Sequence, residues 1–267
     1  MPEENKLTSA PPASASDSNK DALIDALLAG RCADPFAVLG PHPIWSPLGH
    51  GWAIRFFRPG AADASVLVQG VAEPIPARKL RPEGFFEAAL PDSHQGSPAP
   101  SHYRIRYRTG YGETVETFDT YAFPYLLSEF DLHLMGEGRH YDTYEKLGAH
   151  LRTLEGVRGV HFAVWAPSAR RVSLVGDFNR WDGRVNPMRA RGSSGIWELF
   201  IPELGEGAIY KYEIIGASGA MLPLKADPYA FRGELRPNTG SVVVNLDTYQ
   251  WTDTEWMNHR SENPKEG

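Results

Sequence analysis

The sequence predicts an all-β protein made of two tandem immunoglobulin-like β-sandwiches, with a short N-terminal helix and a second short helix in the linker. Three observations support this fold class. The 267 residues include 26 Gly and 22 Pro, a density that favours many short elements joined by turns over long helices. Short segments rich in β-branched and aromatic residues recur between these turns. The second half of the chain repeats the pattern of the first.

The chain opens with a polar segment that is rich in Pro, Ser and Ala. Residues 1–17 have too few apolar side chains to offset the entropy cost of ordering, so we expect a disordered tail without a secretory signal. A helix is predicted over SNKDALIDALLAG, where Ser18 and Asp21 match a capping box and Gly30 supplies the end. Its apolar face comprises Leu23, Ile24, Leu27 and Leu28.

Five strand-like segments follow this helix and the segment DPFAVLGPH. Each is short, rich in aromatic or β-branched residues, and bounded by Gly, Pro or Asp. They are GWAIRFF, ASVLVQG, GFFEAAL, HYRIRY and ETVETF. This spacing is typical of a β-sandwich, so residues 18–130 are predicted to form the first module with its leading helix.

Four stretches of the first half recur, in the same order, in the second half. Most pairs lie 108 residues apart, and two stretches lie 111 and 107 apart. The matches are Pro59 with Pro167, Ala61 with Ala169, Ser65 with Ser173, Gly84 with Gly195, Glu87 with Glu198, Pro91 with Pro202, Tyr103 with Tyr210, and Asp119, Tyr121, Ala122 and Phe123 with Asp227, Tyr229, Ala230 and Phe231. Phe57 falls on Trp165. The repetition predicts two copies of one sandwich, each with its own core.

The boundary between the copies is expected near residues 130–145. Residues 131–150 lack strand alternation and are predicted to be a linker, in which DTYEKLGAHL forms a helix with Tyr144, Leu147 and Leu151 on one face. Residues 151–248 then form the second sandwich, and residues 249–267 a connector.

Charge and cysteine content exclude several classes of function. A net charge of −6 without a long Lys/Arg block leaves no electrostatic footprint for nucleic acid or an anionic membrane. No segment approaches the roughly 18 apolar residues of a spanning helix. Cys32 is the only cysteine, so there is no disulfide framework, and we expect a cytoplasmic protein. No motif for a metal, a cofactor or a catalytic residue is present.

The run from GVHFAVWAPS to AIYKYEII resembles the family 48 carbohydrate-binding module. The preceding DPFAVLGPH and the joint GRHYDTYEKLGAHL resemble the bacterial glycogen branching enzyme family. This resemblance implies the non-catalytic N-terminal part of a 1,4-alpha-glucan branching enzyme. Its partners would be α-1,4-glucan or glycogen and a catalytic barrel. A barrel needs about 250 residues, so none fits in this chain, and the end of the chain resembles the connector that enters it.

The resemblance also points to a glucan-binding site in the segment GDFNRWDG. In glucan-binding relatives a Trp in this loop and a Lys on a later strand contact the sugar, and the matching positions are Trp181 and Lys211, with Asn179 as a nearby polar group. Packing of Trp181 against its own module, and a solvated Lys211, are the alternatives. A second aromatic platform has no counterpart in GASGAMLPLKADP. Trp165 and Trp197 lie within strand patterns and are expected in the core.

Two other functions fit parts of the sequence. A free-standing glycogen-binding or targeting protein would carry the second module without a barrel, but the missing platform aromatic argues against it. Debranching and trehalose-forming enzymes share the second module, but the first module and the joint favour the branching enzyme.

Overall fold

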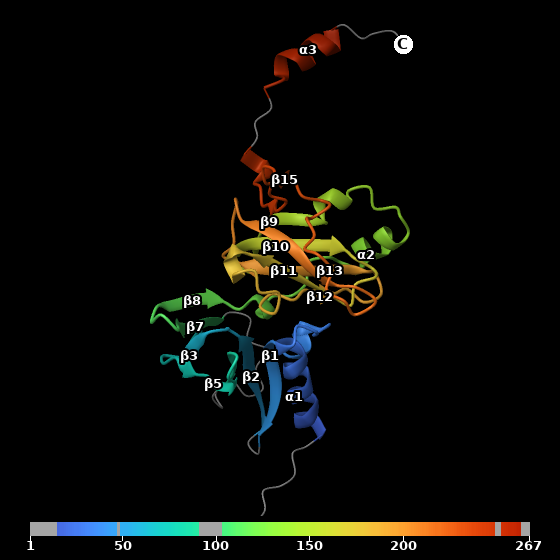
Figure 1. Ribbon diagram of the computed structural model, residues 1–267. Coiled ribbons are helices and arrows are strands. Elements are labelled where there is room, and N and C mark those ends of the chain that lie inside the picture. Colours follow the sequence, from blue (N-terminus) through green and yellow to red (C-terminus); the bar gives the residue numbers. More distant parts are fainter. Residues whose placement is uncertain (1–14, 47–48, 91–102, 249–251, 263–267) are drawn as a thin grey trace, which may run out of the picture.

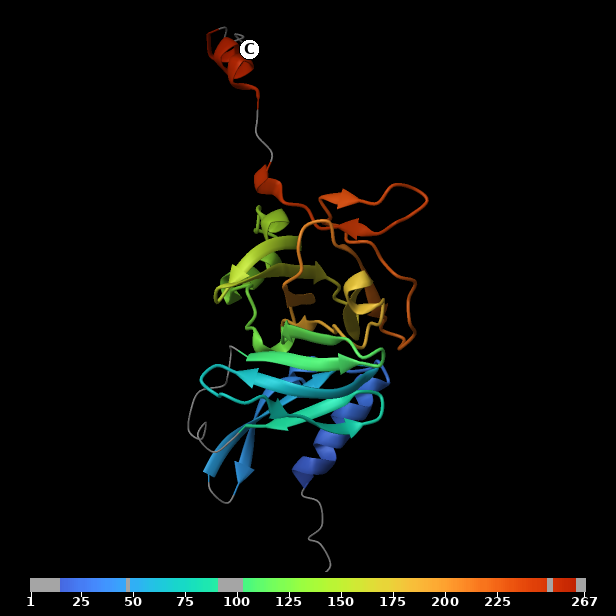
Figure 2. The ribbon, with the colours of Figure 1, turned by 90° about the vertical axis from the view of Figure 1, so that its left-hand side faces the viewer.

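The computed structural model describes residues 15–46, 49–90, 103–248 and 252–262, and it confirms the predicted fold class. Two antiparallel immunoglobulin-like β-sandwiches lie one above the other (Figures 1 and 2). In the first, one sheet has the order β1 (Gly40–Ser46), β2 (Gly49–Phe57), β6 (Phe85–Ala89), β5 (Arg78–Arg81), and the other β4 (Ile75–Pro76), β3 (Ala61–Val68), β7 (Tyr103–Thr109), β8 (Thr114–Phe118). All five predicted strands of this module are among them.

The second sandwich also consists of two four-stranded sheets. One sheet has the order β12 (Arg189–Ala190), β13 (Ile196–Pro202), β10 (Val157–Trp165), β9 (Gly148–Leu154), and the other β11 (Arg171–Gly176), β14 (Ile209–Ile215), β16 (Ser241–Val242), β15 (Arg232–Gly233). Strands β9 and β10 begin and end 108 residues after strands β1 and β2, respectively. The internal duplication is therefore a duplication of structure.

The leading helix α1 (Ala15–Leu28) lies beside β1 and β2 (Figure 1). The apolar face is as predicted, since Ile24 and Leu27 are buried and Leu23 and Leu28 pack against the same cluster. The predicted start is wrong: the helix already includes residues 15–17, so Ser18 lies within it and not at the predicted N-cap position. Residues 1–14 of the predicted tail lie outside the described residues. The helix ends as predicted, with Gly30 in the left-handed region at φ +66°.

The first part of the segment predicted as a linker belongs to a second copy of this leading helix. Helix α2 (Glu129–Gly136) ends 108 positions after α1, and Gly138 follows at φ +68° as Gly30 does after α1. The closing hydrogen bonds repeat as well: Arg31 N–H donates to the carbonyl of Ala26, and Arg139 N–H to that of Leu134. Each unit is thus a helix followed by a sandwich. We call residues 15–123 the first unit and residues 129–243 the second unit.

The predicted helix over DTYEKLGAHL is wrong. Only a 3-10 turn, η4 (Thr143–Glu145), forms there, and strand β9 begins at Gly148, inside the range assigned to the linker. The first unit has the same sequence of elements, with η1 (Pro35–Ala37) before β1. Gly148 has φ +102°, and a Cβ atom there would lie 2.9 Å from the carbonyl oxygen of Tyr229. The backbone reversal at this glycine ends any helical run.

Each unit contains the same buried anchor at the end of its sandwich. Asp119 accepts a hydrogen bond from the Tyr103 hydroxyl at 2.5 Å, and Asp227 accepts one from the Tyr210 hydroxyl at 2.6 Å. Their other carboxylate oxygens accept the backbone N–H groups of Tyr121 and Tyr229. The repeated aspartates therefore hold turns, as their position before Tyr-Ala-Phe predicts.

One apolar cluster joins the two units. It runs from Ile24 and Leu27 of α1, through Phe57 and Tyr121, into the core of the second sandwich around Phe162 and its neighbours. A separate cluster around Phe56 and Ile105 fills the first sandwich. Because the shared cluster is buried and continuous, we expect the units to move as one body.

The chain leaves the second unit through η6 (Leu246–Thr248). Helix α3 (Thr254–Glu262) follows and stands apart from the sandwiches in both views (Figures 1 and 2). Trp256 of α3 is exposed. Residues 249–251 and 263–267 of the predicted connector lie outside the described residues. Within the described part of the chain, no helix is long and apolar enough to cross a membrane.

Candidate functional site

The loop that follows β11 contains the predicted contact residues and has an unusual backbone. After the 3-10 turn η5 (Asp177–Asn179), Arg180 and Trp181 both adopt the left-handed region, at φ +56° and +60°. Consecutive non-glycine residues in this region are uncommon and cost energy, so the surrounding structure must hold them. The Trp181 N–H donates to the carbonyl of Gly176 at 2.9 Å, which closes the loop.

Asn179 supports this loop from within. Its Oδ1 accepts the Gly176 N–H at 3.0 Å, and its Nδ2 donates to the Leu174 carbonyl at 2.8 Å and to Oδ1 of Asn186 at 2.9 Å. The side chain is buried and its amide is used at both ends. This geometry makes Asn179 a positioning residue for Trp181, and its direct contact with a sugar stays a prediction.

Trp181 is neither packed in the core nor free of its own loop. The side chain is 38% exposed, and its Nε1 donates to Oδ1 of Asp177 at 2.8 Å. The hydrogen bond fixes one edge of the indole without burying the ring. A partly exposed indole in a fixed orientation is the kind of surface on which a sugar ring stacks.

Lys211 lies at the same end of the β11–β14 strand pair as the Trp181 loop. It is paired with Val175, one position before the glycine from which the loop departs. Its half-buried side chain donates from Nζ to Oγ1 of Thr239 at 2.7 Å, at an exposed position. The ammonium therefore has one oxygen partner and further donors to offer, and ligand contact and a structural bond to Thr239 are compatible.

A cleft of about 770 Å³ adjoins this loop between the two units. One wall is the β7–β8 hairpin, which lies beneath the second unit in both views (Figures 1 and 2) and contributes Tyr107 and Tyr111. The opposite wall includes Phe178, Arg180 and Asp182, which flank Trp181 in sequence. The predicted contact loop thus borders a cleft that neither unit forms alone, and no sequence signal pointed to it.

The two tryptophans expected in the core behave differently. Trp197 is buried, as predicted. Trp165 is 61% exposed, so its predicted place in the core is wrong. It is the last residue of β10, where side chains alternate between the core, which takes Val164, and the outer face of the sheet.

The buried acids Glu198 and Asp227 are hydrogen-bonded to groups of the fold itself. Glu198 accepts hydrogen bonds from His161 Nε2 at 2.8 Å, from the backbone N–H groups of Leu126 and Leu127, and from the guanidinium of Arg191. Burial would raise the pKa of Glu198, but these donors outweigh it and hold the pKa below the usual value. Burial raises the pKa of Asp227, despite the hydroxyl groups of Tyr210 and Tyr212. Such acids stabilise turns and strand faces.

Comparisons with known proteins agree with this architecture. Residues 20–121 match the family described as alpha-1,4-glucan branching enzyme GlgB, N-terminal domain, and residues 146–230 match Carbohydrate-binding module 48 (Isoamylase N-terminal domain). The chain is 47% identical over 242 residues to a 1,4-alpha-glucan branching enzyme GlgB from Rhodospirillum rubrum, which covers 90% of this chain and 32% of that protein. Proteins of the same description from Paramagnetospirillum magneticum and Gloeobacter violaceus are each 50% identical, over 87% and 89% of this chain and 30% and 31% of their own lengths.

The chain therefore spans about a third of the length of these relatives. Among solved structures, a pullulanase from Anoxybacillus sp. LM18-11 aligns with 79% of this chain and 28% of its own, at 18% identity and a TM-score of 0.34, too low to add to the argument.

Proposed function

We propose, because this chain corresponds to the N-terminal region of 1,4-alpha-glucan branching enzymes, that its two units hold a catalytic barrel in place and contact α-glucan. The chain itself takes no part in the chemistry. The observation that supports glucan contact most strongly is the Trp181 loop, whose strained backbone and buried Asn179 bracing present a partly exposed indole. The setting is the cytoplasm, where the single buried Cys32 stays reduced.

Glucan contact would use an aromatic face and a few donors. The Trp181 ring supplies the face, and Lys211 Nζ has hydrogen-bond capacity beyond its bond to Thr239. The neighbouring cleft offers room for a chain that leaves the indole, and Tyr111 on its far wall is almost fully exposed. The volume of the cleft lies within the range of about 300–1,000 Å³ that is usual for ligand pockets.

Affinity electrophoresis in gels containing glycogen tests this contact. We expect the wild-type chain to be retarded, and Trp181→Ala to lose most of the retardation because the stacking face is gone. Trp165→Ala is the matched control, since it removes an exposed indole outside the loop. Equal mobility of the wild type with and without glycogen would sink the proposed contact.

The branching reaction requires a carboxylate nucleophile and a second carboxyl group as acid and base. Here Asp119, Asp227 and Glu198 are buried and hydrogen-bonded to tyrosines, backbone amides or Arg191. We expect purified chain to leave the iodine spectrum of amylose unchanged. A change of the spectrum that reports new branches would contradict the non-catalytic role.

A further inference from the structure

Four aromatic positions of the first unit recur in the second unit at a spacing of 108 residues. The first aromatic set is Phe36, Phe57, Tyr121 and Phe123, and the second aromatic set is Tyr144, Trp165, Tyr229 and Phe231. In each unit they come from the same elements: the 3-10 turn before the first strand, the end of the second strand, and the turn after the buried aspartate. Their surroundings differ.

The first aromatic set packs against the second unit. The guanidinium carbon of Arg189 lies 3.2 Å from the ring centroid of Phe36, and that of Arg184 lies 5.5 Å from the centroid of Phe57. Phe123 meets the ring of Phe200 edge-to-face at 5.0 Å.

The fourth member of the set, Tyr121, adds a polar contact. Its hydroxyl group lies 3.1 Å from the carbonyl oxygens of both Val185 and Pro187, and these two oxygens share its single proton. The second unit therefore receives the first through two guanidinium groups, a pair of carbonyls and one aromatic ring. Phe57, Tyr121 and Phe123 are each at most 4% exposed.

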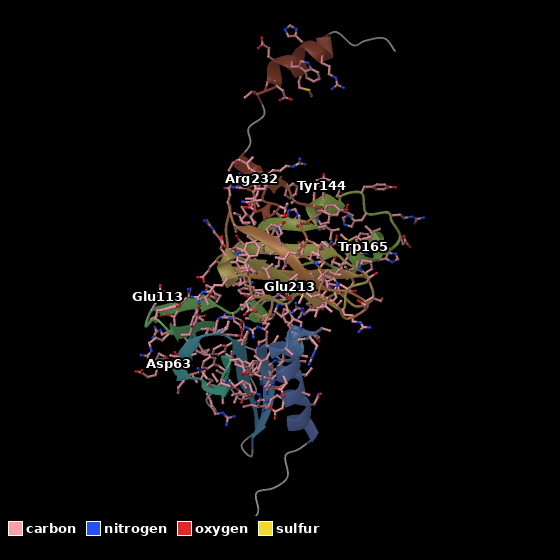
Figure 3. All side chains as sticks on the ribbon, in the orientation of Figure 1. Asp63, Glu113, Tyr144, Trp165, Glu213 and Arg232 are labelled. Atoms are coloured by element: carbon pink, nitrogen blue, oxygen red, sulfur yellow. The ribbon has the colours of Figure 1, made fainter. Side chains whose placement is uncertain are left out.

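The second aromatic set has the same layout and no such cover. Trp165 is 61% exposed, Tyr144 is 52% exposed, and Phe231 is 37% exposed. Figure 3 shows Tyr144 and Trp165 on the side of the second unit where α2 lies. The half-buried Tyr229 connects the set. Its hydroxyl lies 3.5 Å from Oγ1 of Thr143, and it packs against the apolar cluster that contains Ile196, the cross-strand partner of Trp165.

The contact between the units joins different surfaces of two equivalent bodies. In such a head-to-tail contact, the first unit uses a surface whose equivalent on the second unit stays uncovered. That uncovered surface is the second aromatic set. The relatives continue well beyond the matched region, since it makes up only 30–32% of their length. A following domain in the same polypeptide is therefore the occupant that the length of these proteins supplies.

We propose that the second aromatic set is the surface that packs against the domain that follows this region in the branching-enzyme relatives. If this contact uses the same chemistry as the contact between the two units, that domain presents guanidinium groups over the Tyr144 and Trp165 rings and backbone carbonyls to the Tyr229 hydroxyl. The inference rests on the proposed bracing of a catalytic barrel, and it names the surface that performs it.

Hydroxyl-radical oxidation, followed residue by residue by mass spectrometry, tests whether the following domain covers the second aromatic set. The chain alone is compared with a full-length chimera, in which the chain replaces the matched N-terminal region of the Rhodospirillum rubrum relative. We expect oxidation of Tyr144, Trp165 and Phe231 to fall by about fivefold or more in the chimera, because the core of a well-packed interface excludes water. Tyr111 and Trp181 serve as exposed controls that keep their reactivity.

Three outcomes would overturn the proposal, and they differ in what else they overturn. Protection of the second unit at other positions, with this set as reactive as before, would reject this surface and leave the bracing role standing. No protection anywhere on the second unit would reject the bracing role as well. Protection of the set in the chain alone, rising with its concentration, would show that a second copy of the chain is the occupant.

Discussion

The two units share one fold and differ in what covers the same surface. Both have the Asp–Tyr anchor, the glycine that follows the leading helix, and strands in equivalent positions. Phe57 is 1% exposed in the first unit, whereas its counterpart Trp165 is 61% exposed in the second. The fold therefore sets the position of these side chains, and what packs against them sets their burial.

The largest expected effect distinguishes these two positions directly. Phe57→Ala should lower the free energy of unfolding by about 3–5 kcal/mol, because it opens a cavity in the cluster that joins the units. Trp165→Ala should change it by less than about 0.5 kcal/mol in the isolated chain, since the side chain is mostly in water. Urea denaturation measures both variants, and similar losses would contradict the comparison.

The next effect compares the acids at another repeated position. Glu198→Gln should cost about 3 kcal/mol, because it leaves the buried guanidinium of Arg191 without its carboxylate. Glu87→Gln should cost about 1–2 kcal/mol, because Glu87 and its partner Arg55 are more accessible. Thermal unfolding measures the difference, and a larger loss for Glu87→Gln would show that Glu198 is not the more strongly committed acid.

The pH dependence of Glu198 has a defined sign. Its pKa is depressed in the folded chain, so its contribution to stability is present above its ordinary pKa of 4.5 and is lost as the pH falls through the folded value. The stability difference between wild type and Glu198→Gln should therefore shrink between pH 6 and pH 3. Urea titrations along this range check it, and a difference that grows toward pH 3 would reverse the assignment.

The smallest effect concerns the tyrosines of the two turns. Tyr121→Phe removes a buried hydroxyl that bonds to the second unit and should cost about 1–2 kcal/mol. Tyr229→Phe removes only a 3.5 Å contact with Thr143 and should cost less than about 0.5 kcal/mol. Denaturation of the two single variants side by side gives the comparison, and an equal cost would show that the carbonyl contacts add nothing to the joint.

Much of the fold could be predicted from the sequence because its signals are local. The aromatic and β-branched segments predict their strands, and the repeated Asp-Tyr-Ala-Phe turn predicts two copies. Strand β1 has no strand signal in the sequence, because GPHPIWS contains Pro41 and Pro43, which an edge strand tolerates. The predicted linker includes most of helix α2. The 108-residue spacing between Gly30 and Gly138 also relates the segments that precede these two glycines, and it identifies α2 as the copy of α1.

The candidate site was harder to predict because it depends on the surroundings of each side chain. The turn-forming residues of GDFNRWDG point to the loop, but the inward amide of Asn179 and the bond from Lys211 to Thr239 depend on the packed structure. Trp165 shows the limit most clearly. Its strand pattern is that of a buried residue, and its exposure follows from which sheet face it occupies and what lies against that face.

Hydroxyl-radical oxidation of the isolated chain tests the central comparison most directly, because one sample reports both units. We expect rapid oxidation of Tyr144, Trp165 and Phe231 and strong protection of Phe57, Tyr121 and Phe123. Equal reactivity of the two aromatic sets would contradict it.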